Sequence, residues 1–193
     1  MTVVAAHARR RVALEPLLLL GAFGSAVVVR VAVAGPSGPG SIRAGLMFAA
    51  ILAVLAFVSR AGFVVSRRAA IVGAAGAAVL VLPVLVTHGV GGHLAATGYP
   101  IWAVATAAVA TAEEAFLRGA LYDAVARDHG IDAAVVIGAI AFAALHVPLY
   151  GWHVVPLDLA VGLVLGALRV WTGTWTAPAL AHAGADLIGW WLV

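Results

Sequence analysis

The sequence lacks cysteine and lysine, and it carries little charge of either sign. None of its 193 residues is cysteine, which excludes disulfides, thiolate metal ligands and a cysteine nucleophile. Its 11 basic residues are all arginine, and charged residues make up only 10% of the chain. The arginines are scattered over predicted loops and helix ends, so no basic arm or patch indicates nucleic-acid binding.

What the sequence has instead is apolar residues. They make up 64% of the chain, and the mean hydropathy of +1.11 is far above that of soluble domains. A helix needs about 20 apolar residues to cross the hydrocarbon core of a bilayer. Hydrophobic runs separated by charge, glycine or proline predict about seven such spans, near 12–34, 44–59, 69–87, 100–120, 131–147, 154–170 and 175–192. We therefore expect one all-α domain over residues 1–193, a polytopic transmembrane helical bundle in the lipid bilayer.

The distribution of arginine predicts the orientation of this bundle. Positive residues collect on the cytoplasmic side of membrane proteins. Arginines 9–11 precede the first predicted span and most of the others follow the second, fourth and sixth, whereas the intervening loops hold only Arg43. We expect a multi-pass protein of the cell membrane with a cytoplasmic N-terminus. The first span also resembles a secretory signal that ends in the small residues at 32–35, but its length and Arg30 favour a retained anchor.

Four ionisable residues lie near the ends of predicted spans: Glu15, Arg30, Asp158 and Arg169. Long side chains at such positions reach the headgroups, and short ones are solvated at the interface. We therefore expect these four residues to be interfacial and to have no part in function.

Three further sets of residues lie inside three different predicted spans: Glu113 and Glu114 with Arg118, Phe142 with His146, and His182 with Asp186. A charge at the bilayer centre costs about 2.5–3.5 kcal/mol, so such residues usually face one another or a cavity. Glu114 and Arg118 are four residues apart, in the order that favours an intrahelical ion pair. Glu113 points about 100° away around the helix and needs another partner. Interhelical hydrogen bonding would explain any one set, but Ser, Thr or Asn would serve that purpose without burying carboxylates, so together the three sets predict a functional site.

The same residues resemble the motifs of a known family. The segments "EEAFLR" (113–118), "FAALH" (142–146) and "HAGAD" (182–186) reproduce, in order, E-E-x-x-x-R, F-x-x-x-H and H-x-x-x-(N/D). These are the motifs of the CPBP family, which comprises CAAX prenyl endopeptidases and bacteriocin-processing or self-immunity (Abi) proteins. The resemblance covers about residues 100–190, whereas the first three spans are only generically compatible with the family.

The resemblance implies an intramembrane endopeptidase that uses a glutamate to activate water. Glu113 would be the general base, and His146 would share the water with it. Phe142, which shares a helix face with His146, would contact the substrate.

The remaining motif residues would stabilise the reaction. Glu114 with Arg118 would hold the helix and tune the electric field of the site. His182 would stabilise the oxyanion, aided by Asp186.

Asp186 stands where many CAAX-type relatives have asparagine, and an ionised aspartate cannot donate a hydrogen bond to an oxyanion. Three roles stay open for it: a protonated carboxyl, an orienting partner of His182, or a metal ligand. The residue types would suit a zinc site, with Glu113, His146, His182 and Asp186 as its ligands. The spacing differs from the H-E-x-x-H of soluble zincins, and the resemblance favours a metal-independent mechanism, so we expect no cofactor.

The predicted spans place the two histidines at different depths. His182 lies about 10 Å along its helix from the cytoplasmic end, and His146 lies about 22 Å along its own. The stretch "LYDAVARDHG" (121–130) has an amphipathic pattern. If it lies at the interface, it displaces the start of the fifth span and removes the conflict.

We therefore expect a protease that acts on a membrane-associated peptide or protein, with a polar cavity that opens to the cytoplasm. Two other classes stay open. A proton-linked transporter also buries Glu and His, although the sequence shows no inverted repeat or interrupted pair of helices. A non-catalytic immunity or regulatory membrane protein could keep the motifs without the chemistry. No feature of the sequence indicates an oligomeric state or a prenylated substrate.

Overall fold

The computed structural model describes the backbone of residues 3–88 and 98–192 and the side chains of residues 14–82, 84–86 and 98–192. Within these ranges the protein is all-α, without a β-strand. Its helices are α1 (Val3–Ala34), the 3-10 helix η1 (Gly35–Gly40), α2 (Ile42–Val58), α3 (Arg67–His88), α4 (Tyr99–Glu114), the π-helix η2 (Ala115–Leu121), α5 (Tyr122–His129), α6 (Ile131–Tyr150), the 3-10 helix η3 (Trp152–Val154), α7 (Val155–Thr172) and α8 (Thr176–Gly189).

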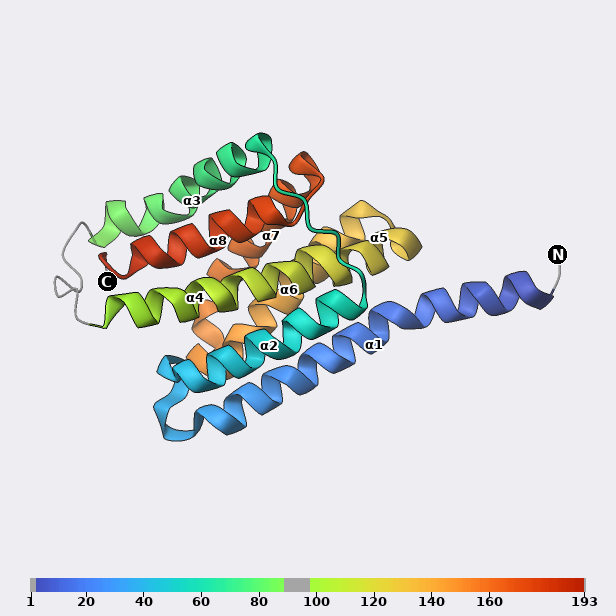
Figure 1. Cartoon of the computed structure of the whole chain (residues 1–193), viewed down its shortest axis with the longest axis horizontal. Coiled ribbons are helices and arrows are strands. Elements are labelled where there is room, and N and C mark those ends of the chain that lie inside the picture. The colour runs from blue at the N-terminus through green and yellow to red at the C-terminus, as the bar shows by residue number, and fades with distance from the viewer. Residues whose placement is uncertain (1–2, 89–97, 193) are drawn as a thin grey trace.

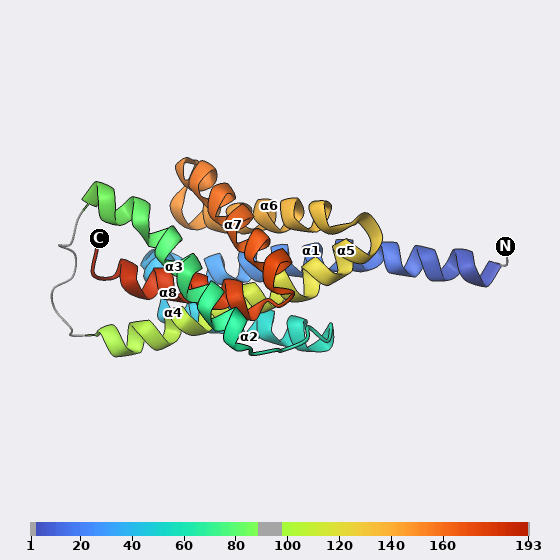
Figure 2. The same ribbon diagram turned by 90° about the horizontal axis from the view of Figure 1, so that it is seen from above.

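The helices run back and forth along one direction, so their connections gather at two ends of the bundle (Figure 1). One end, here called the arginine end, holds the segment between α2 and α3, helix α5 and the turn between α7 and α8. The arginines in or near these segments are Arg60, Arg67, Arg68, Arg127 and Arg169. The opposite end, here called the distal end, holds η1, the first turn of α4, η3 and residues 190–192. The N-terminal part of α1 extends beyond the other helices at the arginine end (Figures 1 and 2), and the side chains of arginines 9–11 in it lie outside the described set.

Each predicted span coincides with a helix, and the predicted all-α bundle is confirmed. Among the described residues, four segments are long and apolar enough to cross a membrane: Leu14–Gly40, Arg67–Val86, Ile131–Tyr150 and Trp152–Thr172. The other three predicted spans contain shorter helices, with 17 residues in α2, 16 in α4 and 14 in α8. The protein is a multi-pass membrane protein built as a helical bundle.

Helix α5 forms in the stretch predicted to be amphipathic. Its Tyr122, Ala124 and Val125 are buried, whereas Arg127 and His129 are exposed. Because α5 continues the line of α4 and η2 outward, α6 begins farther toward the arginine end than α8 does (Figure 2). This offset removes the predicted conflict of depth between the histidines of α6 and α8.

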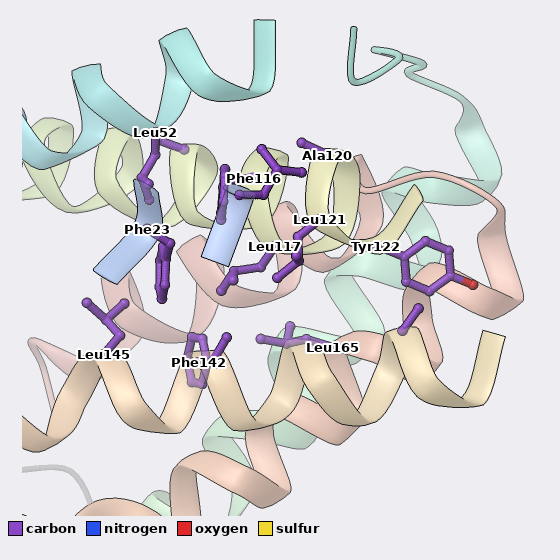
Figure 3. Close-up of a cluster of buried hydrophobic side chains, with 14 of the residues drawn as sticks. Phe23, Leu52, Phe116, Leu117, Ala120, Leu121, Tyr122, Phe142, Leu145 and Leu165 are labelled. Atoms are coloured by element: carbon purple, nitrogen blue, oxygen red, sulfur yellow. The ribbon is translucent and has the colours of Figure 1, made fainter. Parts of the chain in front are cut away.

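The centre of the bundle is packed with aromatic and leucine side chains from α1, α2, η2, α6 and α7 (Figure 3). Phe23 of α1 stacks on Phe116 of η2, with ring centroids 5.3 Å apart. Around them Leu52, Leu145 and Leu165 are completely buried. Lipid tails are as apolar as leucine, so close van der Waals packing, rather than exclusion from water, holds such helices together. This packing fixes the π-helix against α1 and α6.

Two close helix contacts depend on glycine. A Cβ added to Gly162 of α7 would lie 2.7 Å from the Cα of Ala139 in α6, and one added to Gly73 of α3 would lie 2.7 Å from the Cβ of Leu180 in α8. Small residues let transmembrane helices approach until their backbones nearly touch. These contacts set the positions of α7 and α8, which carry part of the candidate site.

Candidate active site

The two adjacent glutamates lie where α4 changes into a π-helix. Glu113 and Glu114 end α4, and the seven residues of η2 follow directly. A π-helix is rare, and short π segments inside α-helices are frequent at functional sites. The segment is held from α7, because the Nε of Arg169 donates to the backbone oxygen of Arg118 at 2.8 Å and its Nη2 lies 2.8 Å from Asp123. Arg169 therefore stabilises the π-helix through these contacts. We expected it to lie at the interface without such a role, and this expectation is wrong.

Glu114 is buried in the core, and one of its carboxylate oxygens accepts two hydrogen bonds. Its Oε1 lies 2.8 Å from the Nη1 of Arg118, which confirms the predicted intrahelical ion pair, and 3.0 Å from the Nδ1 of His182. The side chain of Glu114 is 0% exposed. Arg118 also donates to the backbone oxygen of Gly162 at 3.0 Å, and its guanidinium lies over the ring of Phe142, 5.1 Å from the centroid. These contacts tie η2 to α6, α7 and α8.

Glu113 finds its separate partner on α1. Its Oε1 lies 3.2 Å from the Nη1 of Arg30, and the exposed fractions of the two side chains are 3% and 11%. Arg30 was expected at the interface, and this expectation is wrong. A signal was present in the sequence: by the arginine distribution, Arg30 lies toward the side on which arginine is rare.

His146 is oriented by its own helix and by α7. Its Nδ1 lies 2.9 Å from the backbone oxygen of Phe142 and 3.6 Å from the Oδ2 of Asp158. Asp158 was also expected at the interface, yet its side chain is only 16% exposed. This expectation is wrong because α7 begins at the distal end of a cavity, so that a residue of its first turn faces inward.

His182 stands between two carboxylates. In addition to the contact of its Nδ1 with Glu114, its Nε2 lies 3.5 Å from the Oδ2 of Asp186. The ring of Phe142 lies between the two histidines, with its centroid 5.3 Å from that of His182 and 4.7 Å from that of His146. In Figure 3, Phe142 points from α6 toward the π-helix. Three helices therefore meet at this phenylalanine.

A cavity of about 660 Å³ brings most of these groups together. The predicted site residues that line it are Glu113, Phe142, His146, His182 and Asp186. Arg30 and Asp158, which were not predicted, line it too. Glu114 and Arg118 are not among the lining residues, because both are buried behind it.

The cavity extends from these residues toward the distal end. The lining continues along Pro39 and Ile42 near η1, Trp102 in the first turn of α4, and Trp190 and Leu192 after α8. We expected both a cytoplasmic N-terminus and a cavity open to the cytoplasm. The two expectations are incompatible, because the cavity and the N-terminus lie at opposite ends of the bundle.

Donor atoms of the residues named in the zinc alternative face other partners. Among the described side chains, no group of three or more His, Asp or Glu residues is placed to hold a metal ion. Both ring nitrogens of His182 face carboxylates instead of a common centre. The groups are thus arranged as hydrogen-bonding and ion-pairing partners.

The fold and the site together are those of a polytopic membrane protein with a buried acid and histidine centre. Residues 95–188 match the family model described as type II CAAX prenyl endopeptidase Rce1-like. This part of the chain belongs to that family, and the predicted membership of the CPBP/CAAX proteases is confirmed. The protein is a CAAX-type intramembrane protease, a peptide hydrolase. The matched segment runs from just before α4 into α8 and contains every predicted site residue, whereas α1, α2 and α3 lie outside it. Searches of curated proteins and of solved structures returned no match.

Proposed function

We propose that the protein cleaves a peptide bond in a membrane-associated peptide or protein with water activated by Glu113. One observation carries this proposal: Glu113, His146 and His182, from three helices, line the same cavity. Peptide hydrolysis needs a base for water and a donor for the oxyanion, and these three residues can supply both.

Glu113 and His146 are the groups that handle water. Arg30 engages one oxygen of Glu113, which leaves the other oxygen for water in the cavity. The Nδ1 of His146 is engaged with the backbone oxygen of Phe142, so its Nε2 is the nitrogen that shares the water. A general base in this position contributes about 10²–10⁴ to the rate.

His182 is the oxyanion donor, and Asp186 orients it. Glu114 accepts the proton on the Nδ1 of His182, which holds the ring in one orientation. The Nε2 side then faces Asp186 and the cavity. An ionised Asp186 cannot itself donate to an oxyanion, but its contact with the Nε2 of His182 helps to fix the orientation of the imidazole. Of the three open roles, the contact supports the orienting one.

No metal takes part in this scheme. The reason is the donor set: the nitrogens of His182 are both engaged with carboxylates, and Glu113 is engaged with an arginine. A hydrolytic zinc site needs three such ligands directed at one point.

The test is cleavage of a quenched-fluorescent peptide library by purified protein in detergent, with the wild type beside Glu113→Gln. We expect turnover by the wild type, loss of turnover in Glu113→Gln at unchanged folding, and no effect of a chelator. Loss with the chelator would overturn the metal-free mechanism. Turnover retained by Glu113→Gln would overturn the role of Glu113 as base. A folded wild type that cleaves nothing would favour the non-catalytic or transporter classes.

We also propose that the N-terminus is cytoplasmic and that the cavity therefore receives its substrate from the other side of the membrane. The arginine end supports this orientation, because it holds Arg60, Arg67, Arg68, Arg127 and Arg169, against Arg30 and Arg43 toward the distal end. A substrate segment would then enter past the tryptophans of the distal end.

The absence of cysteine makes the orientation directly measurable. Single cysteines at Ile42 in the distal end and at Phe63 in the arginine end can be labelled in intact cells with a membrane-impermeant maleimide. We expect labelling of Ile42→Cys only. Labelling of Phe63→Cys alone would show that the protein has the opposite orientation, with its cavity open to the cytoplasm.

A further inference from the structure

We infer that α1 completes the active site by supplying Arg30 as the positioning residue for Glu113. This inference rests on the proposed role of Glu113 as base. It extends the site beyond the matched segment 95–188 to a helix for which the sequence indicates no function.

The geometry of the pair is that of a built contact across the bundle. The Nη1 of Arg30 lies 3.2 Å from the Oε1 of Glu113, although 83 residues separate them in the chain. The guanidinium also lies over the ring of Phe48 in α2, 4.9 Å from the centroid. Arg30 is therefore held by one carboxylate and one aromatic face, from two different helices.

Snorkelling does not explain this arginine. Arg30 lies four residues before the end of α1, about 6 Å at the rise of an α-helix, so its side chain could extend to the interface at the distal end. It turns into the bundle instead, and only 9% of the residue is exposed. Moving a guanidinium out of water costs free energy unless an ion-pair partner offsets that cost, and Glu113 is that partner.

In the part of the chain whose side chains are described, no other cation does the same for Glu113. Arg118, the nearest arginine in the sequence, is directed to Glu114 and to the backbone of Gly162. Among the described side chains, Arg30 is the only arginine with a nitrogen within 4.0 Å of Glu113. The two glutamates thus have one arginine each, and only the pair that contains Arg30 lines the cavity.

The pairing has two consequences for catalysis. Arg30 is the counter-ion of Glu113 in an apolar bundle, and only the carboxylate form of Glu113 can accept a proton from water. The contact to one oxygen also fixes the rotation of the carboxylate, so the free oxygen keeps one direction. Misplacing a reacting group by about 1 Å can cost up to roughly 100-fold in rate.

The experiment compares Arg30→Met, Arg30→Lys and the control Arg43→Met. Arg43 is exposed near the distal end and is not among the residues that line the cavity. We expect Arg30→Met to lower kcat by roughly 10- to 100-fold with little change in KM. Arg30→Lys keeps a cation at the same place and should recover most of kcat, and Arg43→Met should match the wild type.

Three results would overturn the inference. A raised KM at unchanged kcat would make Arg30 a substrate-binding residue. Unchanged kinetics with a lowered melting temperature would make the pair structural only. Equal losses in Arg30→Met and Arg30→Lys would show that the charge is not what matters.

A spectroscopic measurement keeps this inference separable from the proposed function. Infrared difference spectra between the wild type and Glu113→Gln isolate the Glu113 band and need no substrate. We expect a carboxylate band in the wild type and in Arg30→Lys, and a protonated carboxyl band in Arg30→Met. If this pattern appears in a protein that cleaves nothing, the pairing stands while the proposed proteolysis fails. A carboxylate band in all three samples would overturn the pairing itself.

Discussion

Glu113 and Glu114 are neighbours in the chain and lie in two different surroundings. Glu114 is enclosed by the core, paired with an arginine on its own helix and with His182. Glu113 lines a cavity and is paired with Arg30 of α1, which precedes it by 83 residues in the chain. The difference shows how one dipeptide can serve two purposes: one carboxylate holds helices together, while the other stays available to water. The following predictions test that division.

The largest effect is expected for Glu114→Gln. A neutral amide cannot balance the completely buried Arg118, and breaking a buried ion pair in this way costs about 3–5 kcal/mol of unfolding free energy. Thermal unfolding in detergent measures this loss, and activity should fall with it because His182 loses its acceptor. A stable Glu114→Gln protein would contradict the assignment of Glu114 to the core.

Glu113→Gln should separate activity from stability. We expect kcat to fall by about 10²–10⁴, while the melting temperature falls less than in Glu114→Gln. The reason is that Arg30, without its partner, still faces a cavity that can admit water, whereas Arg118 without its partner is buried away from water. Kinetics and melting curves on the same preparations decide this, and a melting temperature as low as that of Glu114→Gln would abolish the distinction between the two glutamates.

Asp158→Asn tests the orientation of His146 on the cavity side. Asp158 acts through the histidine, so we expect a roughly tenfold loss of kcat, smaller than the effect of a residue that transfers the proton itself. The measurement is kcat and KM on the best peptide substrate. Leu157→Ala, at an exposed position beside it, is the matched control on the same turn of α7. An unchanged kcat in Asp158→Asn would show that Asp158 does not orient His146 for catalysis.

Asp186→Asn should have a smaller effect still. Asparagine can donate a hydrogen bond to the oxyanion, which an ionised aspartate cannot, and this gain offsets the lost orientation of His182. We expect kcat within about threefold of the wild type. A loss as large as that of Glu113→Gln would mean that the negative charge of Asp186 is essential, and would revive its possible role as a ligand.

The smallest effect is expected at the pair of Glu15 and Arg127. These side chains are 2.8 Å apart, with 39% and 51% of their surfaces exposed. Exposed ion pairs contribute about 0–1 kcal/mol, so Glu15→Gln should change neither the melting temperature nor the rate appreciably. A large loss of stability would show that this exposed ion pair contributes as much as the buried pair of Glu114 and Arg118.

The sequence alone could predict the helices and the residues of α4, η2, α6 and α8 that gather at the site. Hydrophobic length predicts each span because a helix in lipid must satisfy its own backbone. The i,i+4 spacing predicts the pair of Glu114 and Arg118, because both lie on one face of one helix. Arg30 and Asp158 could not be found in this way, because the partners of a charge on one helix depend on which helix lies next to it.

The composition and order of this sequence by themselves determined a membrane-embedded all-α protein and, through three short motifs, its class of chemistry. Only the tertiary structure decided which cation accompanies Glu113 and toward which end the cavity extends. The physical reason is one of range: helix formation and i,i+4 contacts are local, whereas a cavity and its ion pairs arise from the packing of five or more helices, down to the glycine contacts that set their distances.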